Sequence, residues 1–80
     1  MIRERIFNVI ARNTLEVLPD IQPEAISTLK SLAELGANSV DRMEIITLSM
    51  AELGVTIPLV SFATVSNIEG LVDTLSQYVQ

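Results

Sequence analysis

Apolar residues recur at helical spacing along most of the chain and predict several amphipathic helices. In the first such segment, apolar positions three or four residues apart are separated by charged and amide side chains, which predicts a helix from Arg3 to about Val17. A second helix should run from about Ser39 to Leu53, because Gly54 is a residue typical of the position just beyond a helix end.

The second helix is the more apolar of the two. Ile45 and Leu48 extend its apolar surface past one face. A helix with more apolar surface than its core contact requires is either deeply buried or offers the excess to a partner. One stripe of this helix is expected to contain Val40, Met43, Ile46 or Thr47, and Met50. The sequence alone does not divide the apolar residues of this helix between the core and partner contacts.

The long connection between these two helices is expected to be an ordered loop. The run "LPDIQPEAI" carries Pro19 and Pro23, which end one helix and prevent another from starting before Pro23. A helical turn is expected near Ser31 to Leu35. Gly36 should close that turn in a left-handed conformation, which glycine adopts without strain.

Two further helices complete the pattern. Pro58 suits the first position of a short helix that reaches about Phe62. The last helix is expected to be capped by Thr64, or by Ser66 with Glu69 as a capping box. Its inward stripe is expected to be Val65, Ile68, Leu71, Val72, Leu75 and Val79. The pattern therefore predicts an all-α fold, a four-helix bundle of three main helices and a short third one, with a long first loop.

Length and composition indicate one small domain, residues 1–80. Of its 80 residues 49% are hydrophobic and only 4% aromatic, so the core must consist of aliphatic side chains, which favours helices packed on helices. The N-terminal run "MIRERIFNVI" fits an amphipathic helix better than a signal peptide, and no apolar run approaches the length of a membrane span. We therefore expect a soluble, cytoplasmic protein.

Charge and missing residue types exclude several functions. The net charge is −5 and no Lys or Arg follows Arg42, so the phosphates of nucleic acids would be repelled. Without Cys or His, the chain has no thiolate or imidazole metal ligand and no imidazole to activate a serine. Lys30 is the only lysine, and nothing in the sequence places it beside Ser39 as a base. Neither catalytic residues nor a metal site are predicted.

A resemblance to a known family rests on residues around Ser39. An acidic domain of this size, with Gly36-x-x-Ser39 at the start of its second helix and "GVTIP" after that helix, resembles the acyl carrier proteins. The resemblance extends from Ile2 to about Val79. It implies the four-helix fold of that family and 4'-phosphopantetheine attached to Ser39, on which acyl groups are carried as thioesters while partner enzymes perform each reaction.

The physical chemistry of Ser39 agrees with that implication. A phosphodiester on this serine would lie at a helix N-terminus, where free N–H groups and the helix dipole favour negative charge. The alternative is that Ser39 is a plain N-cap, which is a common role for serine.

The surface near Ser39 departs from the usual family pattern. Most carriers of fatty-acid synthesis have Asp-Ser-Leu at this site, whereas this chain has Asn38, Ser39 and Val40. Arg42 places a cation in the first turn, where the helix dipole disfavours it, so it either faces a partner or pairs with Asp41 or Glu44. Partner recognition is expected to involve Asn38, Val40, Asp41, Arg42, Met43 and Ile46.

The run "GANSVDR" followed by "MEI", with "IPLV" downstream, is similar to a narrower group. These are discrete carriers that work with HMG-CoA-synthase-like cassettes in bacterial polyketide pathways. We expect the protein to be a monomer. The resemblance implies a phosphopantetheinyl transferase and an acyltransferase that loads malonyl. It also implies a decarboxylating ketosynthase that leaves acetyl, and an HMG-CoA-synthase-like enzyme that uses this acetyl for β-branching.

Two alternatives remain at this point. A generic fatty-acid or aminoacyl carrier would share Ser39 and the arm but have other partners. An unmodified helical adaptor would keep the fold and use the serine only as a cap.

Overall fold

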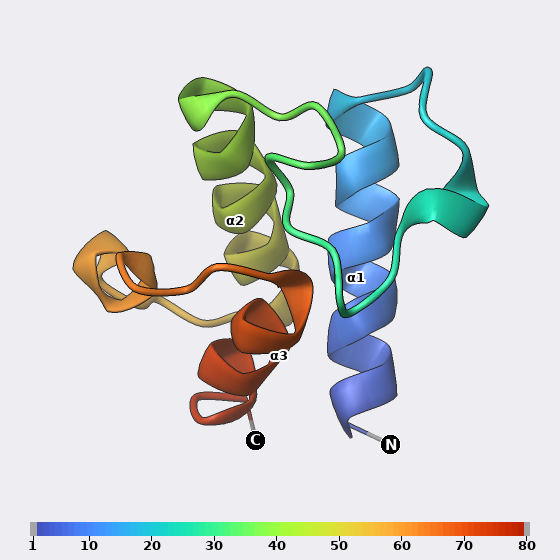
Figure 1. Ribbon diagram of the computed structural model, residues 1–80. Coiled ribbons are helices and arrows are strands. Elements are labelled where there is room, and N and C mark those ends of the chain that lie inside the picture. The colour runs from blue at the N-terminus through green and yellow to red at the C-terminus, as the bar shows by residue number, and fades with distance from the viewer. Residues whose placement is uncertain (1, 80) are drawn as a thin grey trace.

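The computed structural model describes residues 2–79, which form three α-helices and two short 3₁₀ helices and contain no strand. Helices α1 (Ile2–Val17) and α2 (Ser39–Leu53) lie side by side and antiparallel, and α3 (Ile68–Ser76) packs against α1 (Figure 1). The 3₁₀ helices η1 (Pro23–Ala25) and η2 (Leu59–Phe62) lie in the connections. The all-α prediction is confirmed; the predicted domain limits, residues 1 and 80, lie outside the described residues.

The ends of α1 and α2 follow the local signals in the sequence. Helix α1 begins one residue before the predicted start and ends at the predicted Val17, and α2 has the predicted bounds. Gly54 adopts a left-handed conformation with φ of 73°, and its N–H donates to the carbonyl of Ala51. Gly36 also has a positive φ, 107°, as expected for the residue that closes the preceding turn.

The buried face of α2 differs from the predicted stripe. Of the residues expected on one stripe, Ile46 and Met50 are buried, whereas Val40 is 73% exposed and Met43 is 40% exposed. A buried polar residue, Ser49, lies in the middle of the true inward stripe, and its Oγ accepts a hydrogen bond from Asn13 Nδ2 at 3.3 Å. The spacing of apolar residues in the sequence did not reveal this face, because Ser49 is polar. The buried residues of α2 are Ile45, Ile46, Ser49, Met50 and Leu53.

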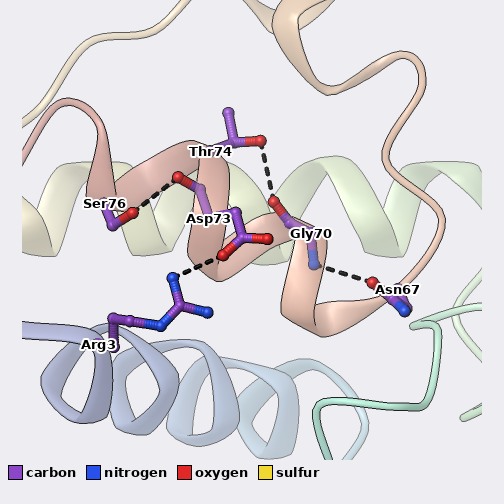
Figure 2. Close-up of polar contacts among 6 residues, drawn as sticks. All are labelled: Arg3, Asn67, Gly70, Asp73, Thr74 and Ser76. Carbon is purple, nitrogen blue, oxygen red and sulfur yellow. Dashed lines mark hydrogen bonds and ion pairs between the residues drawn. The ribbon is translucent and has the colours of Figure 1, made fainter.

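Helix α3 is capped by Asn67, not by either predicted residue. The Asn67 Oδ1 accepts a hydrogen bond from the Gly70 N–H at 2.9 Å (Figure 2). Thr64 and Ser66 both precede the cap, so a capping box between Ser66 and Glu69 does not form. Asparagine and serine are nearly equal N-caps, so local preference alone could not decide between them.

The first loop determines where α3 begins. The N–H of Ile68 donates to the carbonyl of Lys30, and the N–H of Glu69 donates to the carbonyl of Thr28, both at 2.9 Å. Together with the Asn67 cap, these bonds occupy the N–H groups of the first turn of α3. The loop from α1 to α2 is therefore fastened to the end of a helix that follows it by some 40 residues in the chain.

The short elements agree with the sequence in part. The turn expected at Ser31 to Leu35 is present, with the Leu35 N–H donating to the carbonyls of Ser31 and Leu32. The short third helix is a 3₁₀ helix that begins at Leu59, and Pro58 is its N-cap instead of its first residue. The 3₁₀ turn η1, which begins at Pro23, was not predicted.

One aliphatic core joins the three α-helices. The expected inward residues of α3 are buried, while Val65 lies before that helix and is partly buried, and Val79 is buried beyond its end. Within residues 2–79, no helix has both the length and the apolar character needed to cross a bilayer. The fully buried side chains, apart from Ser49, are Ile6, Ile10, Thr14, Ile45, Ile68, Val72 and Leu75.

Candidate functional site

The start of α2 is closed by a reciprocal capping box between Asn38 and Asp41. The Asn38 Oδ1 accepts a hydrogen bond from the Asp41 N–H at 2.7 Å, and the Asp41 Oδ2 accepts one from the Asn38 N–H at 3.2 Å. Ser39 is therefore the first residue of the helix and is not its cap, so the plain-cap interpretation is wrong. Its side chain is exposed and makes no hydrogen bond to any residue between 2 and 79.

This capping box leaves two backbone N–H groups free in the first turn of α2. It satisfies the N–H groups of Asn38 and Asp41, whereas those of Ser39 and Val40 have no acceptor among the described residues. At α3 the corresponding N–H groups are all occupied. Since free N–H groups and the positive end of the helix dipole coincide here, the start of α2 can stabilise an anion next to the Ser39 hydroxyl.

The segment before Ser39 is held firmly by the turn at residues 31–36. Ala37 is buried, and its N–H donates to the carbonyl of the buried Leu32 at 3.0 Å. Ser31 and Glu34 form a second reciprocal pair, in which the Ser31 N–H donates to Glu34 Oε1 at 2.9 Å and the Glu34 N–H donates to Ser31 Oγ at 3.0 Å. The backbone that leads to the exposed Ser39 hydroxyl is therefore held in place by hydrogen bonds.

The electrostatics of the same turn follow from these bonds. The backbone hydrogen bond from Ser31 lowers the pKa of the Glu34 carboxyl, with smaller lowering contributions from the Ser31 hydroxyl and the Lys30 charge and partial opposition from desolvation. Glu34 is therefore ionised at neutral pH, and its charge is committed to the turn.

A cleft of about 240 Å³ opens beside Ser39. Four buried side chains from four separate segments form its apolar floor: Leu32, Ile46, Phe62 and Leu71. The remaining lining residues are Ser31, Ala33, Ser39, Arg42, Met43, Leu59, Ala63, Val65, Ser66 and Asn67. Sequence reasoning did not find this cleft, because its walls come from α2, η2, α3 and the first loop. Its volume exceeds the roughly 150 Å³ of an enclosed cavity that binds benzene, although this cleft is open on one side.

Comparison with known proteins identifies the class to which this site belongs. A family model described as "Phosphopantetheine attachment site" matches residues 10–75. The chain belongs to the acyl carrier protein family. The polyketide biosynthesis acyl-carrier-protein AcpK of Bacillus subtilis (strain 168) is 41% identical to this carrier over 80 residues, covering 100% of the chain and 98% of AcpK. No solved structure gives a significant match.

As an acyl carrier protein, the molecule presents acyl groups to partner enzymes and is not itself a catalyst. Its covalent cofactor is phosphopantetheine, which a phosphopantetheinyl transferase attaches from coenzyme A. This group supplies a terminal thiol that holds acyl groups as thioesters. The first turn of α2 fits the phosphate end of such a group, since it combines an exposed hydroxyl, two free N–H groups and a guanidinium.

Arg42 forms no ion pair within the part of the chain that the structure describes. The ion pairs among residues 2–79 join Arg3 to Asp73, at 2.6 Å, and Arg12 to Glu52 (Figure 2 shows the former). The possible pairing of Arg42 with Asp41 or Glu44 is therefore not observed. The guanidinium lies in the first turn of the helix, where the dipole alone would disfavour it, and remains available to an external anion.

Large apolar side chains are exposed around the cleft. We call Val40, Met43, Leu59 and Val60 the docking surface. Met43 and Leu59 line the cleft, while Val40 follows Ser39 in the chain and Val60 follows Leu59. Val40 and Val60 are 73% and 78% exposed. Of the residues expected to recognise partners, Ile46 is buried at the cleft floor, and Asn38 and Asp41 are engaged in the capping box.

Proposed function

We propose that Ser39 carries the 4'-phosphopantetheine group of this acyl carrier protein. The observation that carries the proposal is the capping box of Asn38 and Asp41, which removes the need for Ser39 as a cap and leaves its hydroxyl exposed beside two free N–H groups. Ser39 also lies within the matched family segment, residues 10–75. The adaptor alternative has no such support, because a merely structural cap would be expected to bond the helix it caps.

Intact mass after incubation with a phosphopantetheinyl transferase and coenzyme A tests this assignment. The wild-type protein should gain the mass of one arm, and Ser39→Ala should gain none. Since the Ser39 side chain makes no hydrogen bond to a described residue, the variant should unfold at nearly the wild-type temperature. Ser66→Ala is the matched control, because Ser66 is also exposed and lines the same cleft. Modification of Ser39→Ala, or its loss in Ser66→Ala, would contradict the assignment.

We further propose that the carrier serves a polyketide pathway as the malonyl and acetyl donor for β-branching. Support comes from the 41% identity to a polyketide biosynthesis carrier over the whole chain and from the resemblance of "GANSVDR" and "IPLV" to donor carriers. In this role an acyltransferase loads malonyl, and a ketosynthase releases carbon dioxide from it to leave acetyl. An HMG-CoA-synthase-like enzyme then adds the methyl carbon of that acetyl group to a β-keto group held on another carrier.

Loading and transfer assays distinguish this donor from a generic carrier. The holo protein, charged separately with acetyl, a longer fatty acyl group and an aminoacyl group, is offered to a cassette synthase of the HMG-CoA-synthase type together with a β-ketoacyl acceptor carrier. Only the acetyl form should give the branched product. Failure of the acetylated protein to act as donor would refute this role and leave the carrier assignment intact.

Partner enzymes are proposed to approach the start of α2. The docking surface is apolar, and two of its residues, Met43 and Leu59, line the same cleft as the hydroxyl that would bear the arm, so enzymes that act on the arm are expected to contact it. An acceptor carrier would bear the same arm, and discrimination between carriers must therefore come from the protein surface. The proposed recognition residues are Asn38, Val40, Asp41, Arg42, Met43 and Ile46. We add Leu59 and Val60 of η2 to them, because both are exposed and Leu59 lines the cleft.

A further inference from the structure

We infer that Arg42 holds the phosphate of the prosthetic arm and thereby fixes how the arm leaves the protein. The inference rests on the proposed attachment at Ser39 and adds a positioning residue for the attached group. It follows from the place of Arg42 on the helix, from the absence of competing partners, and from the charge that attachment introduces.

The spacing of Ser39 and Arg42 places them on the same face of α2. Residues three apart in a helix are surface neighbours, with Cβ atoms about 5–6 Å apart. Helical side chains lean toward the N-terminus, so a long side chain at position 42 covers the turn that contains Ser39. Both residues line the same cleft, which confirms that they face the same space.

Competing carboxylates do not occupy Arg42 in the described part of the chain. No Asp or Glu lines the cleft, and Arg42 is the one charged residue among its lining residues. The adjacent Asp41 accepts the Asn38 N–H through its carboxylate, and no ion pair joins Arg42 to it or to Glu44. Glu34, across the turn, is bonded to Ser31. The guanidinium therefore faces a position where the protein itself supplies no negative charge.

Attachment of the arm would supply that charge. A phosphodiester on the Ser39 Oγ adds one anion to a protein whose net charge is already −5. The free N–H groups of Ser39 and Val40 and the Arg42 guanidinium together form a donor set suited to phosphate, since arginine can donate two parallel hydrogen bonds to one phosphate group. The dipole penalty on Arg42 would be offset at the same time, because the attached phosphate would add a negative charge to the turn that carries the guanidinium.

A comparison of apo and holo stabilities tests the role of Arg42. The melting temperatures of apo and holo forms are measured at low ionic strength for wild type, Arg42→Gln, Arg42→Lys and Arg5→Gln. Phosphopantetheinylation should raise the wild-type melting temperature, and this gain should fall by about half or more in Arg42→Gln, since the charge-assisted bond is lost. Arg42→Lys should keep most of the gain, and salt should reduce it.

Arg5→Gln is the matched control for the loss of one exposed arginine. Arg5 lines a separate hollow on α1 with Glu52, which lies near the other end of α2, about 20 Å along the helix from Ser39. Phosphopantetheinylation should raise the melting temperature of Arg5→Gln by as much as that of wild type. The ³¹P resonance of the holo protein should also shift in Arg42→Gln and not in Arg5→Gln.

The outcomes separate this inference from the proposed attachment. If the rise in melting temperature on phosphopantetheinylation and the ³¹P resonance were the same in Arg42→Gln as in wild type, the role of Arg42 would be overturned. Ser39 would remain the attachment site. If instead wild-type protein accepts no arm at all, the proposed function itself fails and the inference fails with it.

Discussion

At the scale of single residues, Glu34 shows how the site is supported from outside the helix. Its carboxylate accepts the Ser31 N–H, and its own N–H donates to the Ser31 hydroxyl, so one pair of residues fixes the turn that leads to Ser39. Asn38 and Asp41 repeat the same exchange seven residues later. Ser39 follows the first pair and lies between the two members of the second, and its hydroxyl takes part in neither.

The lowered pKa of Glu34 predicts a pH-dependent contribution to stability. Because the folded-state pKa lies below the ordinary value of 4.5, the stabilisation is fully present above that value and is lost as the pH falls through the lowered pKa. Glu34→Gln should therefore melt at a lower temperature than wild type at pH 7. The two melting curves should converge in acid, where the glutamic acid is neutral like glutamine. A difference that stays constant over this range would show that the charge of Glu34 does not stabilise the turn.

At the scale of elements, α2 and α3 begin in contrasting ways. The first-turn N–H groups of α3 are occupied by Asn67 and by the carbonyls of Thr28 and Lys30, whereas two N–H groups of α2 remain free. This contrast explains the limits of sequence reasoning. The bounds of α1 and α2 depend on periodicity and on residues such as Gly54, which are local. The cap of α3 depends on a distant loop, which no local signal reveals.

The site was predictable to the same extent. Ser39 could be placed at the start of α2 because glycine, asparagine and serine mark that start locally. The cleft beside it could not be predicted, since Leu32, Phe62 and Leu71 meet there only after folding. The sequence also left the apolar residues of α2 undivided between core and surface, because the polar Ser49 lies on the buried face while the apolar Val40 is exposed.

Gly70 of α3 lies next to Val65, a residue that lines the cleft. A Cβ atom at this position would lie 3.0 Å from Val65 Cγ1, and Val65 lines the cleft. Alanine is favoured over glycine within a helix by about 1 kcal/mol, so Gly70→Ala combines a gain in propensity with a close contact. Gly70→Ala should raise the free energy of unfolding by the full amount in the Val65→Ala background. In the wild-type background it should raise that free energy less, or lower it. Urea unfolding of the four proteins measures this coupling; additive effects would show that Val65 moves aside freely.

At the scale of the whole molecule, the two faces of α2 have different environments. Its inner face, with Ile45 fully buried, joins the core against α1, while its outer face and η2 surround the cleft with exposed apolar side chains. A net charge of −5 opposes self-association of this small protein through those side chains. If these exposed apolar residues contact partner enzymes, as proposed, substitution there should affect acyl transfer without affecting folding.

Val60 and Leu29 provide a matched test of that separation. They are 78% and 77% exposed, but Val60 belongs to the docking surface, whereas Leu29 is not among the residues that line the cleft and lies outside that surface. Val60→Asp and Leu29→Asp add the same charge and should each change the free energy of unfolding by less than about 0.5 kcal/mol. Burial of one valine side chain contributes about 1.5 kcal/mol, so Val60→Asp should lower kcat/KM for acetyl transfer to the cassette synthase about tenfold. Leu29→Asp should leave kcat/KM near the wild-type value. Equal loss in both variants would indicate a general effect of charge, and an unchanged rate in Val60→Asp would place the contact surface elsewhere on the carrier.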